Sequence, residues 1–154
     1  MARDDETEGE RLDRNWNDIL QELRVTQTGT QILLGFLLTI PFQQRFGDLD
    51  AGQIGIYLVL VAVAAVATIS ALGPVALHRA LFRQGAKPRL VHLGSALLRV
   101  TLVAVAITLC GTVLLIFDVV IGLAAGIVAG AIAAVLTLAG WAVLPALARR
   151  RVRP

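Results

Sequence analysis

The chain has little cysteine, lysine, aromatic character or charge, and each shortage excludes a class of protein. Cys110 is the only cysteine, so neither an intrachain disulfide nor a cysteine metal cluster can form. Lys87 is the only lysine among fourteen basic residues. Only 16% of the 154 residues are charged, and most of these charges lie in a few clusters. These shortages exclude a disulfide scaffold, a disordered chain and most soluble enzymes.

The sequence contains long stretches of apolar residues without charge. Hydrophobic residues make up 56% of the chain, against about 45–50% in a soluble domain, and the mean hydropathy is +0.75. Four stretches without acidic or basic residues are about as long as the 20 or so apolar residues that cross a bilayer. We therefore expect an all-α polytopic protein in a lipid bilayer. The four predicted transmembrane helices lie at about 25–43, 53–73, 97–117 and 120–146.

Basic residues lie next to the predicted spans and predict the orientation. Thirteen of the fourteen occur in residues 1–24, 79–99 and 149–154. By the positive-inside rule, both termini and the central connector are cytoplasmic. Anionic headgroups, rather than nucleic acid, account for this basic character. The richness in Arg, Ala, Val and Leu is typical of GC-rich bacterial genes, so we expect a multi-pass protein of the bacterial plasma membrane.

The two ends differ from the membrane domain that we expect at residues 12–148. Residues 1–11 are polar and acidic, which predicts a disordered tail, and residues 149–154 form a basic cytoplasmic tail. Trp16, Ile19 and Leu23 recur at helical spacing. They predict an amphipathic helix that lies at the headgroups or runs into the first span, with Trp16 as an interfacial anchor.

Three local signals predict where the spans begin and end. Asp50 and Gln53 have the spacing of a capping box at the start of the second span. The pair Gly73-Pro74 predicts that this span kinks or ends there, followed by a cytoplasmic connector at 76–90. Asp118 predicts a tight outer turn and an N-cap for the fourth span, and an attraction for cations is the alternative.

A polar seam marks the inner half of the first span. Its members alternate at spacings of four and three residues: Asn17, Gln21, Arg24, Thr28, Gln31 and Gly35. Because polar groups in hydrocarbon need partners, two interpretations stay open. Arg24, Thr28 and Gln31 either hydrogen-bond across a helix interface or line a hydrated pathway at the axis of an oligomer.

Two further patterns predict contacts between helices. Glu22 and Arg99 lie just inside the first and third spans, and we expect Glu22 to pair with Arg99 or with Arg79. The alternative is that each charge reaches the headgroups. A ladder of small residues in the fourth span, formed by Gly122, Gly126 and Gly130, predicts close helix packing, with a partner helix in the same chain or in another.

Reactive motifs are absent from the sequence. It contains no phosphate-binding loop, nucleophile elbow or paired histidines with metal spacing, so we expect neither an enzyme nor a bound cofactor or metal. A four-span bundle has little room for a solute path within one chain, so we expect a homo-oligomeric ion channel or transporter for monovalent cations or protons. The alternative is a membrane scaffold that binds lipid or a partner protein.

Three runs of sequence resemble one family of small actinobacterial membrane proteins of unknown function. The runs are RLDRNWNDILQELRVTQTGTQILLGFLLTIPFQQRF at 11–46, PVALHRALFRQGAK at 74–87 and LLIFDVVIG at 114–122. The resemblance implies a four-span protein of the bacterial plasma membrane, and its members are often automatically labelled sodium:proton antiporters. Proton-coupled exchangers normally carry an ionisable group near the midplane, and no span here has a carboxylate at its middle.

Overall fold

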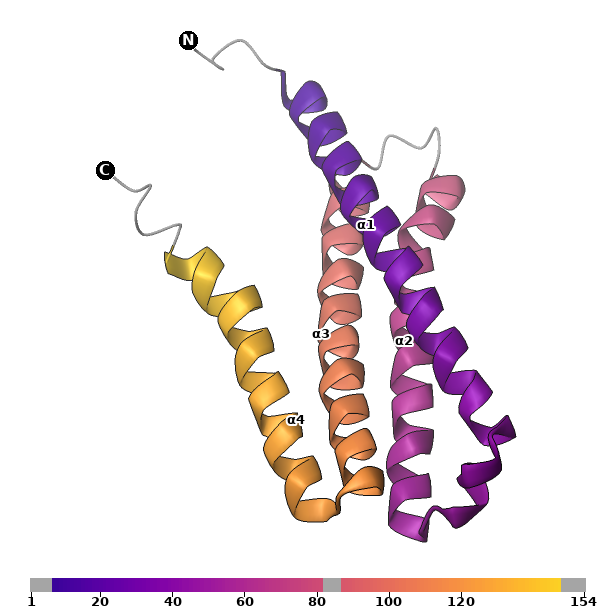
Figure 1. Ribbon diagram of the computed structural model, residues 1–154. Coiled ribbons are helices and arrows are strands. Elements are labelled where there is room, and N and C mark those ends of the chain that lie inside the picture. Colours follow the sequence, from indigo (N-terminus) through magenta and orange to yellow (C-terminus); the bar gives the residue numbers. More distant parts are fainter. Residues whose placement is uncertain (1–6, 82–86, 148–154) are drawn as a thin grey trace. The chain divides into compact units, whose positions relative to one another are not determined.

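All elements in the described residues, 7–81 and 87–147, are helical in the computed structural model. In chain order they are α1 (Glu8–Thr39), η1 (Ile40–Phe42), η2 (Gln44–Asp48), α2 (Ala51–Leu81), α3 (Lys87–Val120), α4 (Leu123–Leu138) and the π-helical η3 (Ala139–Val143). Figure 1 labels the four α-helices. Four helical segments are long and apolar enough to cross a membrane, and they overlap the four predicted spans. These segments are Arg14–Phe42, Ala51–Leu77, Val91–Val120 and Leu123–Leu147.

Helix α1 begins earlier than the sequence predicts. The backbone N–H and the hydroxyl of Thr7 donate to the Glu10 carboxylate at 2.9 and 2.8 Å, while the backbone N–H of Glu10 donates to Thr7 Oγ1 at 3.3 Å. This reciprocal pair is a capping box. The prediction of disorder up to residue 11 is therefore wrong from Glu8 onward, and α1 runs without a break into the first span. The basic tail at 149–154 lies outside the described residues.

Helix α2 begins as predicted and ends later than predicted. Gln53 N–H donates to Asp50 Oδ1 at 2.9 Å, and Asp50 N–H donates to Gln53 Oε1 at 3.2 Å, which confirms the capping box. The helix continues past Pro74 to Leu81, so the expectation of a connector from residue 76 is wrong up to Leu81 and again from Lys87. Proline removes one backbone donor, and this loss at the buried Pro74 does not end the helix.

The turn between α3 and α4 is made by a glycine rather than by Asp118. Helix α3 passes through Asp118 and ends at Val120. Gly122 has a φ of 129°, a backbone conformation that residues with a Cβ rarely adopt, and it caps α4 without a side-chain hydrogen bond. The prediction that Asp118 caps α4 is therefore wrong, because the chain reverses two to four residues after it.

The C-terminal end of the fourth segment changes its hydrogen-bond pattern. In η3, the N–H of Leu144 donates to the carbonyl of Ala139, five residues back. Pro145 follows directly and has no N–H with which to continue an α-helical ladder. The wider π turn keeps the segment helical up to Leu147.

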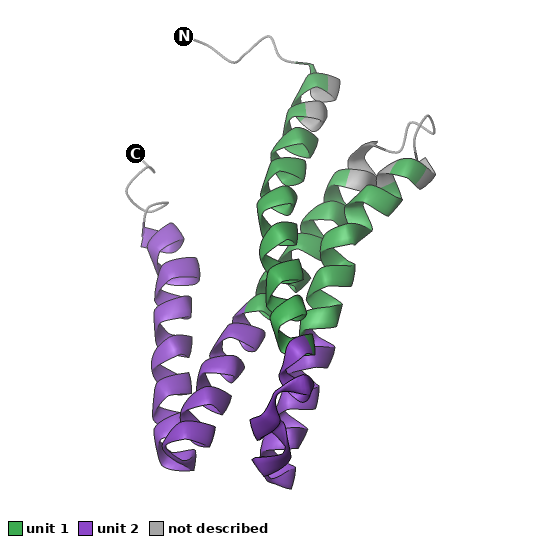
Figure 2. Ribbon diagram, turned by 45° about the vertical axis from the view of Figure 1, so that its right-hand side comes forward, with its two compact units in different colours: residues 1–38, 64–105 green, residues 39–63, 106–154 purple. Residues whose placement is uncertain are grey.

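The chain divides into two compact units, which are coloured separately in Figure 2. Unit 1 comprises residues 1–38 and 64–105, and unit 2 comprises residues 39–63 and 106–154. In unit 1, Ile19 and Leu23 of α1 form a core with Leu98 of α3. Trp16 is only 8% exposed, because Gly94 of α3 leaves room for its indole ring. Trp16 therefore packs within unit 1, and its role as an interfacial anchor stays a prediction.

Unit 2 is held together by close contacts at α3. A Cβ atom built on Gly111 would lie 2.4 Å from a methyl group of Leu60 on α2, so this glycine receives the leucine side chain. Near the start of α2, the rings of Phe46 and Tyr57 meet edge to face with centroids 5.3 Å apart. Both contacts anchor α2 and the preceding 3-10 turns within the unit.

Candidate functional site

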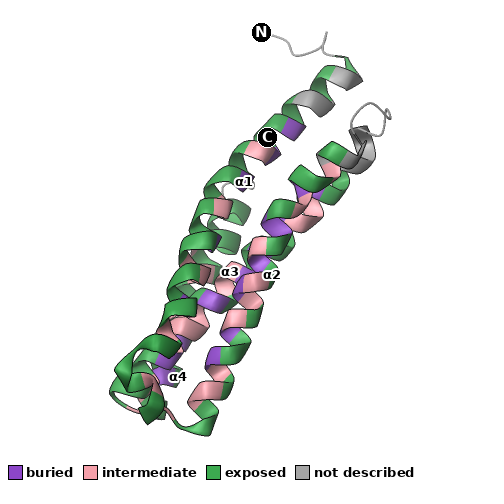
Figure 3. Ribbon diagram, turned by 90° about the vertical axis from the view of Figure 1, so that its right-hand side faces the viewer, coloured by how far each residue is buried: buried purple, intermediate pink, exposed green. Residues whose placement is uncertain are grey.

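The buried face of α1 follows a seven-residue repeat. Trp16, Leu23, Thr30 and Leu37 are all buried. Figure 3 shows separate buried positions along an otherwise largely exposed α1. This repeat is the pattern of a helix that packs along a neighbour in the same chain. It uses different residues from the polar seam that the sequence analysis singles out.

The predicted polar seam lies on the exposed side of α1. Arg24, Thr28 and Gln31 are all exposed, as are the other three members, Asn17, Gln21 and Gly35. We call these six residues the polar stripe. Thr39, four residues after Gly35, is exposed as well. Thr39 is not among the residues predicted from the sequence, although its spacing continues the pattern to the last residue of α1.

The threonine hydroxyls of α1 obtain hydrogen bonds within the helix. Thr26 donates to the Glu22 carbonyl at 2.8 Å, Thr28 to the Arg24 carbonyl at 3.1 Å, and Thr30 to the Gln27 carbonyl at 3.0 Å. Such bonds remove much of the cost of placing a hydroxyl in hydrocarbon. Gln31 differs, because its amide is exposed and forms no hydrogen bond with another described residue. Its donors and acceptor are therefore available to groups outside the chain.

The predicted ion pair between Glu22 and Arg99 is not formed. Both side chains are exposed, and neither forms an ion pair with another described residue, Arg79 included. Within the described part of the chain, Glu22, Arg24 and Arg99 therefore have no charged partner.

A small polar cluster links α2 and α3 within unit 2. Gln53 Nε2 donates to Asp118 Oδ2 at 3.4 Å, while the same side chain accepts from the backbone N–H of Asp50. Gln53 thus caps its own helix and reaches the neighbouring one. The cap follows from the sequence, whereas this second contact does not, because nothing in the local spacing relates residue 53 to residue 118.

The glycines of α4 divide into two roles. Gly126 and Gly130 are buried against α3, where an added Cβ would lie 2.7 Å from the Leu114 carbonyl oxygen and 2.9 Å from Leu114 Cβ, respectively. The partner helix is thus in the same chain. Gly122 makes the turn, and a Cβ there would meet nothing within 4 Å. Further along, Cys110 Sγ lies 3.8 Å from Thr137 Oγ1.

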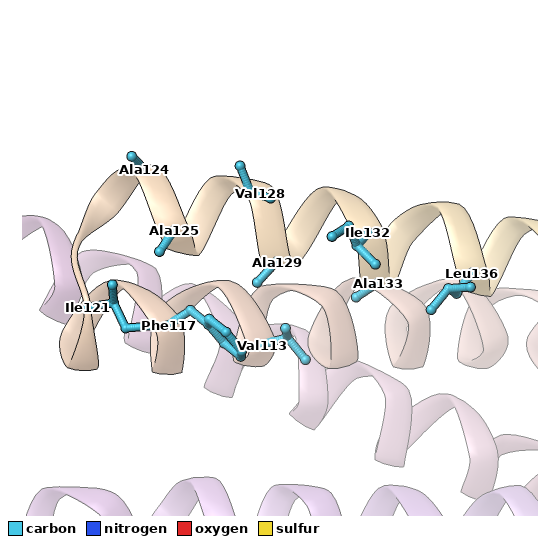
Figure 4. A pocket seen from close by; sticks show the side chains of 10 residues that line it. All are labelled: Val113, Phe117, Ile121, Ala124, Ala125, Val128, Ala129, Ile132, Ala133 and Leu136. Carbon is cyan, nitrogen blue, oxygen red and sulfur yellow. The ribbon is translucent and has the colours of Figure 1, made fainter.

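An apolar groove of about 670 Å³ runs along α3 and α4 in unit 2. In Figure 4 the side chains of Ala125, Ala129 and Ala133 point from α4 toward α3 and keep the groove open. All ten lining residues are alanine, valine, isoleucine, leucine or phenylalanine. The groove therefore offers dispersion contacts to hydrocarbon and no hydrogen-bonding side chain to a polar ligand.

Groups that could hold a metal ion do not occur in the described residues, where no three His, Cys, Asp or Glu side chains come together. The polar groups that the described residues expose along α1 are thus hydrogen-bonding groups and charges, not a cluster of reactive side chains. This arrangement suits contact with water, ions, lipid headgroups or another helix.

Comparisons with known proteins give one match. The model of a family of unknown function, DUF6328, matches residues 5–145. No curated protein and no solved structure matches the chain.

Proposed function

The chain belongs to DUF6328, a family of unknown function, and we propose that it is a homo-oligomeric ion channel or transporter for monovalent cations or protons. It acts in a bacterial plasma membrane. In this proposal the polar stripes of several copies of α1 surround a shared hydrated path. Lipid covers the remaining surfaces.

The observation that carries this proposal is the outward placement of Arg24, Thr28 and Gln31. If this polar face packed inside one chain, its side chains could not line a path shared by several copies. The face is instead exposed along α1. Thr39 continues the exposed face beyond Gly35, so polar and small residues extend to the outer end of the helix. A path needs such groups at both ends, because an ion that loses its water needs replacement contacts.

The membrane location is supported by length, apolarity and exposure. The most apolar window of α4 is only 6% buried within the chain. Its exposed residues include Ile127, Val128 and Val135, which suit acyl chains and not water. The basic residues flank the spans on one side, which supports cytoplasmic termini and a cytoplasmic connector between α2 and α3.

Flux into proteoliposomes tests the proposed path. The Gln31→Leu variant removes a hydrogen-bonding group from the stripe, which raises the barrier by about 1–3 kcal/mol and so lowers the ion flux about fivefold or more. The matched control is Gln27→Leu, the same chemical change at a half-buried position of α1 outside the stripe, which keeps wild-type flux. Absence of flux from the wild-type protein, or equal flux from the Gln31→Leu variant, contradicts the proposal.

A membrane scaffold that transports nothing is the second candidate function. The observation that favours it is that Thr26, Thr28 and Thr30 satisfy their hydroxyls within α1 and need no water. In a scaffold the stripe holds a dry interface through the Gln31 amide. A wild-type protein that assembles in liposomes but passes neither monovalent cations nor protons supports this candidate over the first.

A further inference from the structure

Two opposite charges on α1 lie at nearly the same depth and lack a charged partner within the described chain. Glu22 and Arg24 are both exposed, and neither pairs with another described residue. They are two residues apart, which places them about 3 Å apart along the helix axis. Near the membrane boundary, the screening of such charges is only partial, and each gains from an opposite charge close by.

Glu22 and Arg24 cannot pair with each other on one helix. Residues at positions i and i+2 do not face each other, because each residue turns the helix by about 100°. The two side chains therefore lie on opposite flanks of the exposed side of α1. Asp18, one turn before Glu22, is exposed and adds negative charge on the same flank. One flank of the helix is thus basic at Arg24, and the other is acidic.

We infer that α1 docks against α1 of a second copy of this chain, with Arg24 of one copy paired to Glu22 of the next. This inference rests on the proposed function, because it requires copies that share one membrane orientation. Rotation about the membrane normal keeps equivalent residues at equal depth, so two residues that differ by about 3 Å in height meet across the interface. The pairing closes a ring in which each chain contributes both flanks.

The charge pattern favours a ring over a two-fold dimer through the same helix. A two-fold contact centred on either flank places Arg24 against Arg24 or Glu22 against Glu22, which costs free energy. A two-fold contact centred between the flanks leaves both charges, which lie about 160° apart around the helix, at its sides and not within it. In a ring the basic flank of one copy meets the acidic flank of the next. Gln21, which is exposed and lies about 60° from Arg24 and about 100° from Glu22 around the helix, then faces the centre of the ring.

Charge reversal with native mass spectrometry in lipid nanodiscs tests this inference. The Glu22→Arg and Arg24→Glu variants each place like charges at the contact, and we expect each to weaken association about tenfold or more, corresponding to about 1.4 kcal/mol. The Glu22→Arg/Arg24→Glu double variant restores opposite charges, and we expect it to recover the wild-type distribution of oligomers. Unchanged oligomers in both single variants, or no recovery in the double variant, overturns the inference.

A second pair of variants provides the control. If Glu22 pairs with α3 of its own chain, Glu22→Arg combined with Arg99→Glu restores the wild-type distribution and Glu22→Arg combined with Arg24→Glu does not. This result overturns the inference.

Salt dependence gives a readout that does not depend on reversed charges. Raising the ionic strength weakens the wild-type oligomer and has little effect on the Glu22→Gln/Arg24→Gln double variant. An equal response of both proteins to salt overturns the inference. The oligomer is measured without ion flux, so an assembly that obeys the charge rules but transports nothing refutes the proposed function alone.

Discussion

At the scale of single residues, the glycines show which positions are set by packing. Gly126 allows α4 to approach the backbone of α3, whereas Gly55 on α2 has open space where a Cβ would be, with nothing within 4 Å. The sequence predicts the packing role of the ladder from its four-residue spacing. It does not separate Gly122 from the other two members, because a positive φ leaves no mark on the spacing.

Alanine substitution of these two glycines separates the two environments. The Gly126→Ala variant must displace the Leu114 carbonyl and the Asp118 backbone, so we expect it to lose about 1–3 kcal/mol of unfolding free energy. The Gly55→Ala variant gains helix propensity without a clash and is neutral or stabilised by up to about 1 kcal/mol. Unfolding in mixed micelles, followed by circular dichroism, measures both. Equal stabilities would show that α4 does not approach α3 at Gly126.

At the scale of the helices, a pair of polar residues with capping-box spacing predicts a helix start better than a single polar residue near a turn predicts a cap. The box at Asp50 and Gln53 follows from three-residue spacing and is confirmed. The same spacing at Thr7 and Glu10 lies in an acidic segment whose composition suggests disorder, so the start of α1 was placed too late. Asp118 fails as a cap because α3 continues through it to Val120 and Gly122 takes the cap position of α4. Its carboxylate accepts from Gln53 instead, a tertiary contact that local pattern does not encode.

The capping box of α1 predicts a pH response. The backbone N–H and hydroxyl of Thr7 bond to the Glu10 carboxylate and lower its pKa from the ordinary value. Because the pKa in the folded state is the lower one, the cap contributes fully above the ordinary glutamate pKa and is lost as the pH falls through the lowered value.

Amide hydrogen exchange near Glu10 measures this response. We expect faster exchange of the first helical turn below the lowered pKa of Glu10 and, at neutral pH, in the Glu10→Ala variant. Exchange around Gln53, in the box of α2, serves as the internal control for the Glu10→Ala variant and stays unchanged. A first turn whose exchange is the same in that variant would contradict the cap.

At the scale of the whole chain, two faces of α1 follow two different repeats. The sequence analysis recognises the polar stripe, but from the sequence alone it does not decide whether the stripe packs inside the chain. The structure gives the buried positions to Trp16, Leu23, Thr30 and Leu37 and leaves the stripe exposed. In a soluble protein, the apolar face of a helix is the face that packs inside the chain. In lipid, an apolar face can remain exposed to acyl chains, so either face of α1 could be the buried one. For this reason the sequence alone does not tell which face of α1 is buried.

Cross-linking of single cysteines in native-like membranes tests most directly whether the polar stripe faces other copies of the chain. In a Cys110→Ser background, the Gly35→Cys and Gly55→Cys variants place thiols on α1 and α2, at two exposed positions that both have open space within the chain. Gly35 belongs to the stripe and Gly55 lies outside α1, so a short bifunctional thiol reagent should join copies through position 35 and not through position 55. Cross-linking through position 55 with none through position 35 would contradict the account.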